Sequence, residues 1–323
     1  MKEIGGYIEL DRYTLPMLHE NAKALNCGRN CLAYLIRARG IKKIALPYFL
    51  CDSVKKVCQK EGVQIRSYNI NTQFVPESLE LQEDEWLYIV NFYGQLSYEQ
   101  TEFFFRKYKR LIVDSAQAYF EQPLKDTDTI YTCRKFFGVP DGAFLYTDAE
   151  LSDELTRDES FERMRFLLGR YERNASEFYE QYNLNNKMFA DEPIKKMSKL
   201  TENLLHGIDY DFVKNRRTEN YNFLFDSLSD TNRLKLKRIK GAFAYPLWIK
   251  NGAEIRRRLL EYKIYIPTLW PNVLNDAPEN ILEYDMAENI LPIPCDQRYS
   301  EKDMQYIIEV LLELYKNSYR LKS

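Results

Sequence analysis

Short apolar runs alternate with helix-like segments along the first half of the chain. Each run is long enough only for a strand, and the segments between them carry apolar residues at helical spacing. The predicted strands are 42–47, 63–68, 86–91 and 110–115, and the predicted helices are 31–39, 52–60 and 98–109. Gly40 and Gly62 follow the first two helices, as is common at helix ends. The alternation predicts an α/β fold with a mostly parallel sheet.

The pattern changes near residue 150. From about 150 to 228 the chain is helical and charged, and then short apolar runs alternate with helical patterns again. A terminal helix is predicted from about Ser300. A chain of 323 residues is long enough for two domains. We expect a large domain over residues 1–206 and a small C-terminal α/β domain over residues 207–323.

A lysine stands between two further predicted strands, 130–132 and 143–147. The turn that joins them contains Gly, Pro and Asp. Lys135 precedes this turn and is followed by Phe136 and Phe137. Such a lysine is either a surface residue whose stem covers the aromatic rings, or an amine held among apolar groups for its chemistry. The residues around it allow both interpretations.

Composition limits the class of protein. Hydrophobic residues make up 45% of the chain and charged residues 29%, which supports a sizeable core. The net charge of −2 and the pI near 6.0 do not indicate nucleic acid or an anionic membrane as a partner. No apolar run approaches the roughly 20 residues that span a bilayer, and the N-terminus lacks a signal-peptide core. The six scattered cysteines are expected as reduced thiols, so we expect a cytoplasmic protein.

Few residues are suited to metal binding or to histidine-based catalysis. His19 and His206 are the only histidines, and neither has a Cys or His partner at metal-ligand spacing. Cys27 and Cys31 are four residues apart, but a zinc site needs two more ligands, so core thiols are the favoured interpretation. No glycine-rich dinucleotide motif and no P-loop motif occurs. We expect no metal site, and an enzyme with this sequence needs a residue other than histidine for proton transfer.

Two groups of polar residues occupy positions where α/β proteins bind ligands. Asp114 lies at the end of a predicted strand, at the edge of the sheet where ligands bind, and Gln117 follows three residues later. A helix cap is an equally good interpretation of Asp114 alone. Gly28 and Arg29 precede the first helix, where backbone amides can hold an anion. Taken alone, these two residues are more typical of an ordinary helix start.

Taken in order, these segments resemble the DegT/DnrJ/EryC1/StrS family, the sugar-aminotransferase branch of the fold-type-I pyridoxal-phosphate enzymes. The stretch "VDSAQAYF" resembles the family's D-x-A-Q motif, and "CRKFFGVPDGAFLYT" resembles a variant of its lysine motif. These two motifs are specific as a pair. Supporting similarities lie in "LNCGRNCLAYLIRARGI", "ALPYFLCDSVKKVCQKEGVQIRSY", "IVNFYGQ", "YNLNNKM" and "LPIPCDQRYSEKDM".

The resemblance implies pyridoxal 5'-phosphate as cofactor and a role for each matched residue. Lys135 would form the internal aldimine and would then shuttle a proton, which removes the need for a histidine. Asp114 would pair with the protonated pyridine nitrogen. Gln117 would lie against the ring near its 3-hydroxyl. The phosphate-binding residues would be Gly28, Arg29 and Thr132.

The resemblance also implies the fold and the assembly. The family has a large domain with a mostly parallel, seven-stranded sheet flanked by helices, and a small C-terminal α/β domain. Asn185 aligns with an asparagine that reaches the phosphate from the neighbouring subunit, which implies a homodimer with shared active sites. Cys51 takes a position at which the family often stacks an aromatic residue on the pyridine ring, and Phe49 and Tyr93 are alternative ring contacts. The expected substrate contacts are Asn91, Tyr93 and Trp270.

The reaction implied by the resemblance is an amino transfer. The expected donor is glutamate, and the expected acceptor is a keto sugar of a nucleotide-sugar, for cell-surface polysaccharide biosynthesis. The alternatives are a pyridoxal-phosphate enzyme that acts on another amino or keto substrate, and a catalytically degenerate binding or regulatory protein. The arginine runs at 216–217 and 256–258 could meet a diphosphate, but the solvated face of a helix is the favoured interpretation.

Overall fold

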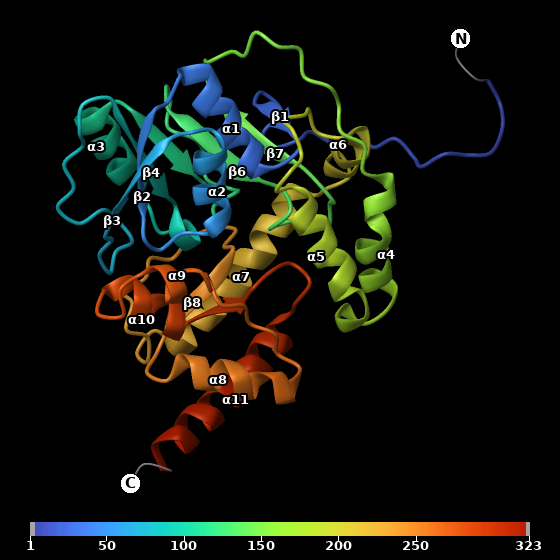
Figure 1. Ribbon diagram of the computed structural model, residues 1–323. Helices are drawn as coiled ribbons and strands as arrows, with labels where there is room; N and C mark the ends of the chain where they lie inside the picture. The colour runs from blue at the N-terminus through green and yellow to red at the C-terminus, as the bar shows by residue number, and fades with distance from the viewer. Residues whose placement is uncertain (1–3, 321–323) are drawn as a thin grey trace.

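Seven strands form one sheet in the upper part of the molecule (Figure 1). The computed structural model describes residues 4–320. The strands are β1 (Lys23–Leu25), β2 (Lys43–Pro47), β3 (Gln64–Tyr68), β4 (Glu85–Val90), β5 (Leu111–Asp114), β6 (Asp128–Thr132) and β7 (Ala143–Tyr146). Their order is β1-β7-β6-β5-β4-β2-β3, and β7 pairs antiparallel with both neighbours while all other pairs are parallel. The predicted α/β fold with a mostly parallel sheet is confirmed.

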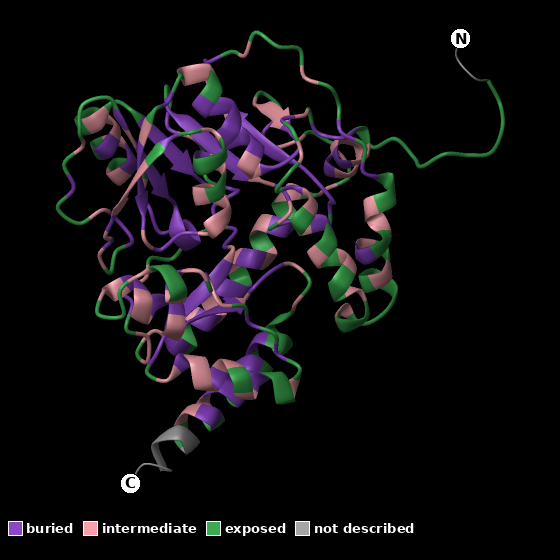
Figure 2. Ribbon diagram, viewed as in Figure 1, coloured by how far each residue is buried: buried purple, intermediate pink, exposed green. Residues whose placement is uncertain are grey.

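Helices cover both faces of this sheet and build the rest of the chain. The α-helices are α1 (Gly28–Arg39), α2 (Asp52–Lys60), α3 (Tyr98–Tyr108), α4 (Arg165–Glu172), α5 (Tyr179–Met188), α6 (Lys199–Leu205), α7 (Tyr210–Leu228), α8 (Gly252–Leu259), α9 (Val273–Asp276), α10 (Leu282–Asn289) and α11 (Glu301–Arg320). The short 3-10 helices are η1 (Phe92–Gly94), η2 (Phe161–Met164), η3 (Ala175–Phe178) and η4 (Leu260–Tyr262). The β2–α2–β3 and β4–α3–β5 connections run in opposite directions across the sheet, so right-handed crossovers place α2 and α3 on opposite faces. The strands between these helices are mostly buried (Figure 2).

Local sequence signals set the ends of the helices that flank the sheet. Gly40 follows α1 with a φ of 63°, a left-handed conformation that glycine adopts at low cost. Ser97 precedes α3, and its side chain accepts a hydrogen bond from the Gln100 amide while the Gln100 side chain accepts one from the Ser97 amide. None of the helices within residues 4–320 is both long and apolar enough to cross a lipid bilayer.

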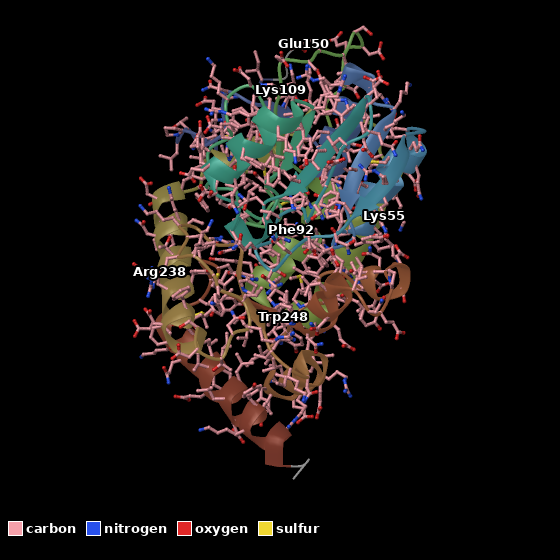
Figure 3. All side chains as sticks on the ribbon, turned by 90° about the vertical axis from the view of Figure 1, so that its left-hand side faces the viewer. Lys55, Phe92, Lys109, Glu150, Arg238 and Trp248 are labelled. Carbon is pink, nitrogen blue, oxygen red and sulfur yellow. The ribbon has the colours of Figure 1, made fainter. Side chains whose placement is uncertain are left out.

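The lower part of the molecule is a smaller α/β unit. The strands β8 (Ala244–Trp248) and β9 (Ile290–Pro294) pair antiparallel, and α7, α8 and α11 pack around them. Trp248 and Trp270 nevertheless belong to the same buried cluster as the large sheet. Figure 3 shows Phe92 at the lower margin of the upper part and Trp248 below it. The two parts therefore share a continuous apolar contact, and the domain boundary between residues 206 and 207 stays a prediction.

One of the two histidines is part of the aromatic core. His19 is fully buried and stacks on Tyr131, with ring centroids 4.1 Å apart. Its Nε2 lies 2.8 Å from the Tyr119 carbonyl and must donate to it, so Nδ1 accepts from the Tyr146 hydroxyl at 3.1 Å. This arrangement fits the neutral ring. Burial lowers the pKa of His19 to about 4, only partly opposed by the bond to the Tyr119 carbonyl.

The His19 environment predicts a loss of stability in acid. The unfolded chain binds a proton at the ordinary histidine pKa of 6.5, whereas the folded chain binds it only near 4. The stabilisation is therefore complete above pH 6.5 and decreases as the pH falls towards 4, by about 2–3 kcal/mol at pH 4.5. His19→Gln should reduce this loss. Urea unfolding of both proteins at pH 7 and 4.5 measures the difference, and equal losses would contradict it.

Candidate active site

The carboxyl ends of four parallel strands meet at one edge of the sheet. Cys51 follows β2, Asn91 follows β4, Asp114 ends β5 and Lys135 follows β6. The chain leaves β2 towards β3 but leaves β4 towards β5, so the direction of winding changes between β2 and β4. Open α/β sheets bind ligands in the crevice at such a switch point. The topology thus brings residues from four distant segments to the place where a ligand is expected.

Lys135 lies in the loop that joins β6 to β7. Lys135 is an exposed residue, and the protein packed around its ammonium lowers the pKa of that group mainly by desolvation. Among nearby charges, Asp114 and then Cys51 raise this pKa, and Arg134 lowers it. The Phe243 ring centroid lies 5.5 Å from Nζ. These neighbours favour the reacting-amine interpretation, which stays a prediction.

The far half of the lysine loop is fixed by a buried carboxylate. Asp141 accepts hydrogen bonds from the Ser198 amide at 2.9 Å, from the Ser198 hydroxyl at 2.7 Å, and from the Thr201 hydroxyl. Gly142 has a φ of 107°, and a Cβ there would lie 2.9 Å from the Thr201 methyl group. A residue with a side chain would be strained at this position. The loop therefore holds Lys135 on a rigid support.

Asp114 is a buried carboxylate with two donors. Tyr88 donates its hydroxyl to Oδ2 at 2.8 Å, and the Ala116 amide donates to Oδ1 at 2.8 Å. Burial, and then the neighbouring Asp114 charge, raises the pKa of Tyr88, so its hydroxyl stays protonated and can donate. No helix begins directly after Asp114, because the chain forms turns before β6. The helix-cap interpretation of Asp114 is therefore wrong, and the carboxylate remains available to the site.

An anion-binding arrangement lies at the start of α1. Cys27 precedes the helix in an extended conformation and makes no side-chain capping bond, so the first amides of α1 lack a side-chain cap. The Arg29 guanidinium donates to the Asn186 carbonyl at 3.0 Å, and the Arg134 guanidinium donates to the Asn186 side-chain oxygen. Within residues 4–320, neither guanidinium forms an ion pair with a carboxylate. Burial is the main cause that lowers the pKa of Arg134, and the Arg29 charge adds to it. Two unpaired cations beside a helix start favour an anionic ligand.

Four further predicted cofactor contacts lie at or after the ends of strands at this edge, or at the start of α1. Gln117 is buried, and its Oε1 accepts a hydrogen bond from the Tyr93 amide at 2.8 Å. Thr132 is half-buried at the end of β6. Cys51 is half-buried, precedes α2, and accepts a hydrogen bond from the Ser53 hydroxyl at 3.1 Å. Gly28 begins α1. Phe49 is fully buried against the Trp270 ring, with centroids 5.1 Å apart, so it presents no free face for ring stacking.

The Asn185 side chain is buried within this chain and donates to the Pro140 carbonyl at 2.9 Å, in the lysine loop. Its contact with a partner subunit's phosphate stays a prediction. Its neighbour Asn186 contacts Arg29 and Arg134 instead. The sequence analysis did not predict roles for Arg134 and Asn186. The position of Arg134 directly before Lys135 could have indicated that it lies at the site.

The predicted substrate contacts are all buried. The Asn91 side chain accepts from the Leu96 amide at 2.9 Å and so holds the turn after β4. Tyr93 is 0% exposed and has a φ of 53°. Trp270 packs on Phe92, with ring centroids 6.0 Å apart. Tyr93 and Trp270 lie in the contact between the upper and lower parts, and the role of all three residues as substrate contacts stays a prediction.

The arginine runs also depart from the expected solvated helix face. Arg217 is 2% exposed and donates to three acceptors inside the protein. Arg216, its neighbour, lies at the surface and pairs with Glu219 at 3.3 Å. Arg256 donates to the carbonyls of Glu288 and Ile290. The solvated-face interpretation is therefore wrong for Arg217, and its contacts leave no donor pointing to an external diphosphate.

A cavity lies away from this edge of the sheet. Its volume is about 840 Å³, and its walls are α3 and the segment 75–80. None of the strand-edge residues described above lines it. The chemistry of the residues, rather than the size of the cavity, therefore places the candidate site at the strand edge.

Comparison with known proteins gives a match in structure but not in sequence. No family model matches the chain, and no curated protein matches it in sequence. The sugar aminotransferase CalS13 from Micromonospora echinospora is 15% identical, with a TM-score of 0.61 over 90% of this chain and 86% of that one. NtdA from Bacillus subtilis, with the bound cofactor PMP, is 14% identical, with a TM-score of 0.65 over 91% and 73%.

A third structure carries the name of the family that the sequence resembles. It is a DegT DnrJ EryC1 StrS aminotransferase from Brucella abortus, 14% identical, with a TM-score of 0.61 over 91% of this chain and 85% of that one. All three alignments extend over both the large sheet and the small α/β part, because they cover nine-tenths or more of the chain. The chain therefore has the fold of the sugar aminotransferases, as the order of its motifs predicts.

Proposed function

We propose that this chain is a pyridoxal-phosphate-dependent aminotransferase. The observation that carries the proposal is the placement of Lys135 and Asp114 at one edge of the sheet, with the amine desolvated and within range of the carboxylate charge. The structural neighbours support it, because they are aminotransferases and one of them holds the cofactor PMP. A fold alone does not define an activity, so the site residues are essential to the argument.

The residues at the strand edge fit pyridoxal phosphate. Its phosphate carries a charge of about −1.5 to −2, which Arg29, Arg134 and the uncapped start of α1 would balance. Asp114 would hold the pyridine nitrogen in its protonated form, and Lys135 would bind the aldehyde carbon. When bound, the cofactor supplies an electron sink for the carbon that loses its proton. Cys51 lies on the same side as Lys135 and is our candidate for the contact with the ring.

We assign the roles of nucleophile and of proton-transferring base to Lys135. Desolvation favours its neutral amine, which is the nucleophilic and basic form. The same nitrogen would serve as the base that moves a proton from the substrate carbon. Neither histidine is needed, which agrees with the burial of His19 in the aromatic core. The 5.5 Å contact with Phe243 makes that ring one wall of the space in which the substrate reacts.

The similarity to the sugar aminotransferase CalS13 supports a sugar acceptor, and the sequence resemblance adds the nucleotide group and glutamate as donor. The homodimer stays a prediction of that resemblance.

The central test is a covalent trap. Borohydride reduction of the protein with pyridoxal phosphate should leave a stable adduct on Lys135, identified by peptide mass spectrometry. Lys135→Ala should lose the adduct and the visible absorption band. Lys187→Ala, which removes an exposed lysine from α5, is the matched control and should keep both. A parent protein that binds no pyridoxal phosphate overturns the assignment.

The anion-binding arrangement predicts a phosphate-dependent loss of affinity. Arg134→Gln should raise the Kd for pyridoxal phosphate roughly tenfold to a hundredfold, because a charge-assisted hydrogen bond contributes about 1.5–3 kcal/mol. The Kd for pyridoxal, which lacks the phosphate, should change little. Arg170→Gln removes an exposed arginine from α4 and serves as control. Equal losses for both compounds would mean that Arg134 supports the fold and not the phosphate.

The acceptor is tested by a substrate comparison. With L-glutamate as donor, the protein should convert nucleotide-linked keto sugars faster than free keto acids, measured as the release of 2-oxoglutarate. The expected outcome rests on the sugar acceptors of the neighbouring structures. A clear preference for free keto acids would overturn the sugar assignment and leave the cofactor assignment standing.

A further inference from the structure

A buried arginine contacts the backbone of the lysine loop from the lower part of the molecule. Arg217 lies on α7, is 2% exposed, and is among the largest fully buried side chains of the described part of the chain. Its Nη2 donates to the Phe136 carbonyl at 3.2 Å and its Nη1 to the Ala242 carbonyl at 2.9 Å. Its guanidinium also stacks on the Phe136 ring, 4.6 Å from the centroid. The carbonyl that it holds is that of the residue directly after Lys135.

A glutamine completes this contact. Gln297 accepts a hydrogen bond from Arg217 Nε at 2.8 Å and donates from Nε2 to the same Phe136 carbonyl at 2.8 Å. The Phe136 carbonyl thus receives two donors, and the two donors are bonded to each other. Such a closed set of bonds fixes one position of the carbonyl in a way that a single bond does not. We call these two side chains the Arg217–Gln297 clamp.

The charge of the clamp is costly to bury. Among residues 4–320, Arg217 forms no ion pair, and Asp296, the carboxylate whose charge acts on it, bonds to Arg298 instead. Burial lowers the pKa of Arg217, which reflects this cost. Its three bonds go to two carbonyls and one side-chain oxygen, so they fix the direction of each of these groups. The contribution of Arg217 is therefore directional as well as energetic.

The clamp connects both sides of the reacting amine. On one side it holds the Phe136 carbonyl, which fixes the backbone that carries Lys135. On the other side it holds the Ala242 carbonyl, and the next residue, Phe243, places its ring over Lys135 Nζ. A displacement of either contact changes the position of the amine relative to its surroundings. Misplacement by about 1 Å is enough to slow a positioned reaction roughly a hundredfold.

We propose that the Arg217–Gln297 clamp is a positioning device that sets the orientation and the desolvation of the Lys135 amine. The proposal rests on the proposed function, since it gives Lys135 the role of the reacting amine. Arg217 and Gln297 do not touch the reacting atoms and act through the Phe136 carbonyl.

The test measures Lys135 directly, first without the cofactor. Competitive labelling of the apoprotein with an amine reagent over a range of pH, followed by peptide mass spectrometry, gives the pKa of Lys135. In the parent it should lie below the ordinary lysine value of 10.5. Gln297→Leu, which removes the half-buried member of the clamp, should raise it by roughly one pH unit as the amine becomes more solvated. The rate at which Lys135 combines with pyridoxal phosphate should then fall about tenfold, because less of the amine is neutral.

Two further variants separate positioning from stability. Arg217→Lys keeps a charge but not the planar set of donors, and should shift the pKa of Lys135 in the same direction as Gln297→Leu. Arg216→Lys alters the half-buried neighbour on the same helix, which pairs with Glu219, and should leave the pKa and the rate at parent values. Urea unfolding reports how far each variant is destabilised. If Arg217→Lys does not fold, Gln297→Leu decides the question.

The outcomes distinguish the two proposals. A folded Gln297→Leu protein with the parent's Lys135 pKa and rate overturns the positioning role. A parent protein whose Lys135 never combines with pyridoxal phosphate overturns the proposed function, while a pKa shift in the apoprotein variants would still support the clamp.

Discussion

The candidate site depends on the parallel pairing of β2, β4, β5 and β6. The carboxyl ends of parallel strands lie at a common edge of the sheet. The polar residues that follow these strands therefore come together at that edge. Asp114 and Lys135 come together only through this pairing, since each is fixed by its own strand end. A change in the register of β5 by one residue would turn Asp114 to the other face. The relative position of Asp114 and Lys135 therefore depends first on the register of the strands.

Charge is unevenly distributed around this edge. The charge of Arg29 acts on Arg134, and the charge of Arg134 acts on Lys135. Both arginines also act on Cys27. Asp114 is the one carboxylate among the charges that act on the lysine. Such an excess of positive charge in a desolvated place is unfavourable unless an anion joins it. Desolvation, and to a smaller extent the Arg134 charge, lowers the pKa of Lys135, while the unpaired arginines are the groups that would attract the phosphate of the proposed cofactor.

The sequence predicts the parts of the structure that local patterns determine. Strand ends, the glycine after α1 and the residues of the lysine loop follow from short-range signals, and Asp114 follows from its place at a strand end. The contacts of Asn186 with Arg29 and Arg134 join residues far apart in the chain, and no local pattern marks them. The burial of the expected substrate contacts is also non-local. Tyr93 lies against Phe243, and Trp270 packs on Phe92, and these contacts between the two parts are visible only in three dimensions.

The lower part of the molecule does more than close the apolar core. Its helix α7 delivers Arg217 to the lysine loop, its β8 begins just after Phe243, and the segment after β9 supplies Gln297. Two segments of the smaller unit therefore donate to one carbonyl of the larger one, and Phe243 adds its ring near the Lys135 amine. If the small unit moves relative to the sheet while these bonds persist, the backbone next to Lys135 moves with it. The contact between the two parts is in this way a mechanical link to the amine as well as a source of stability.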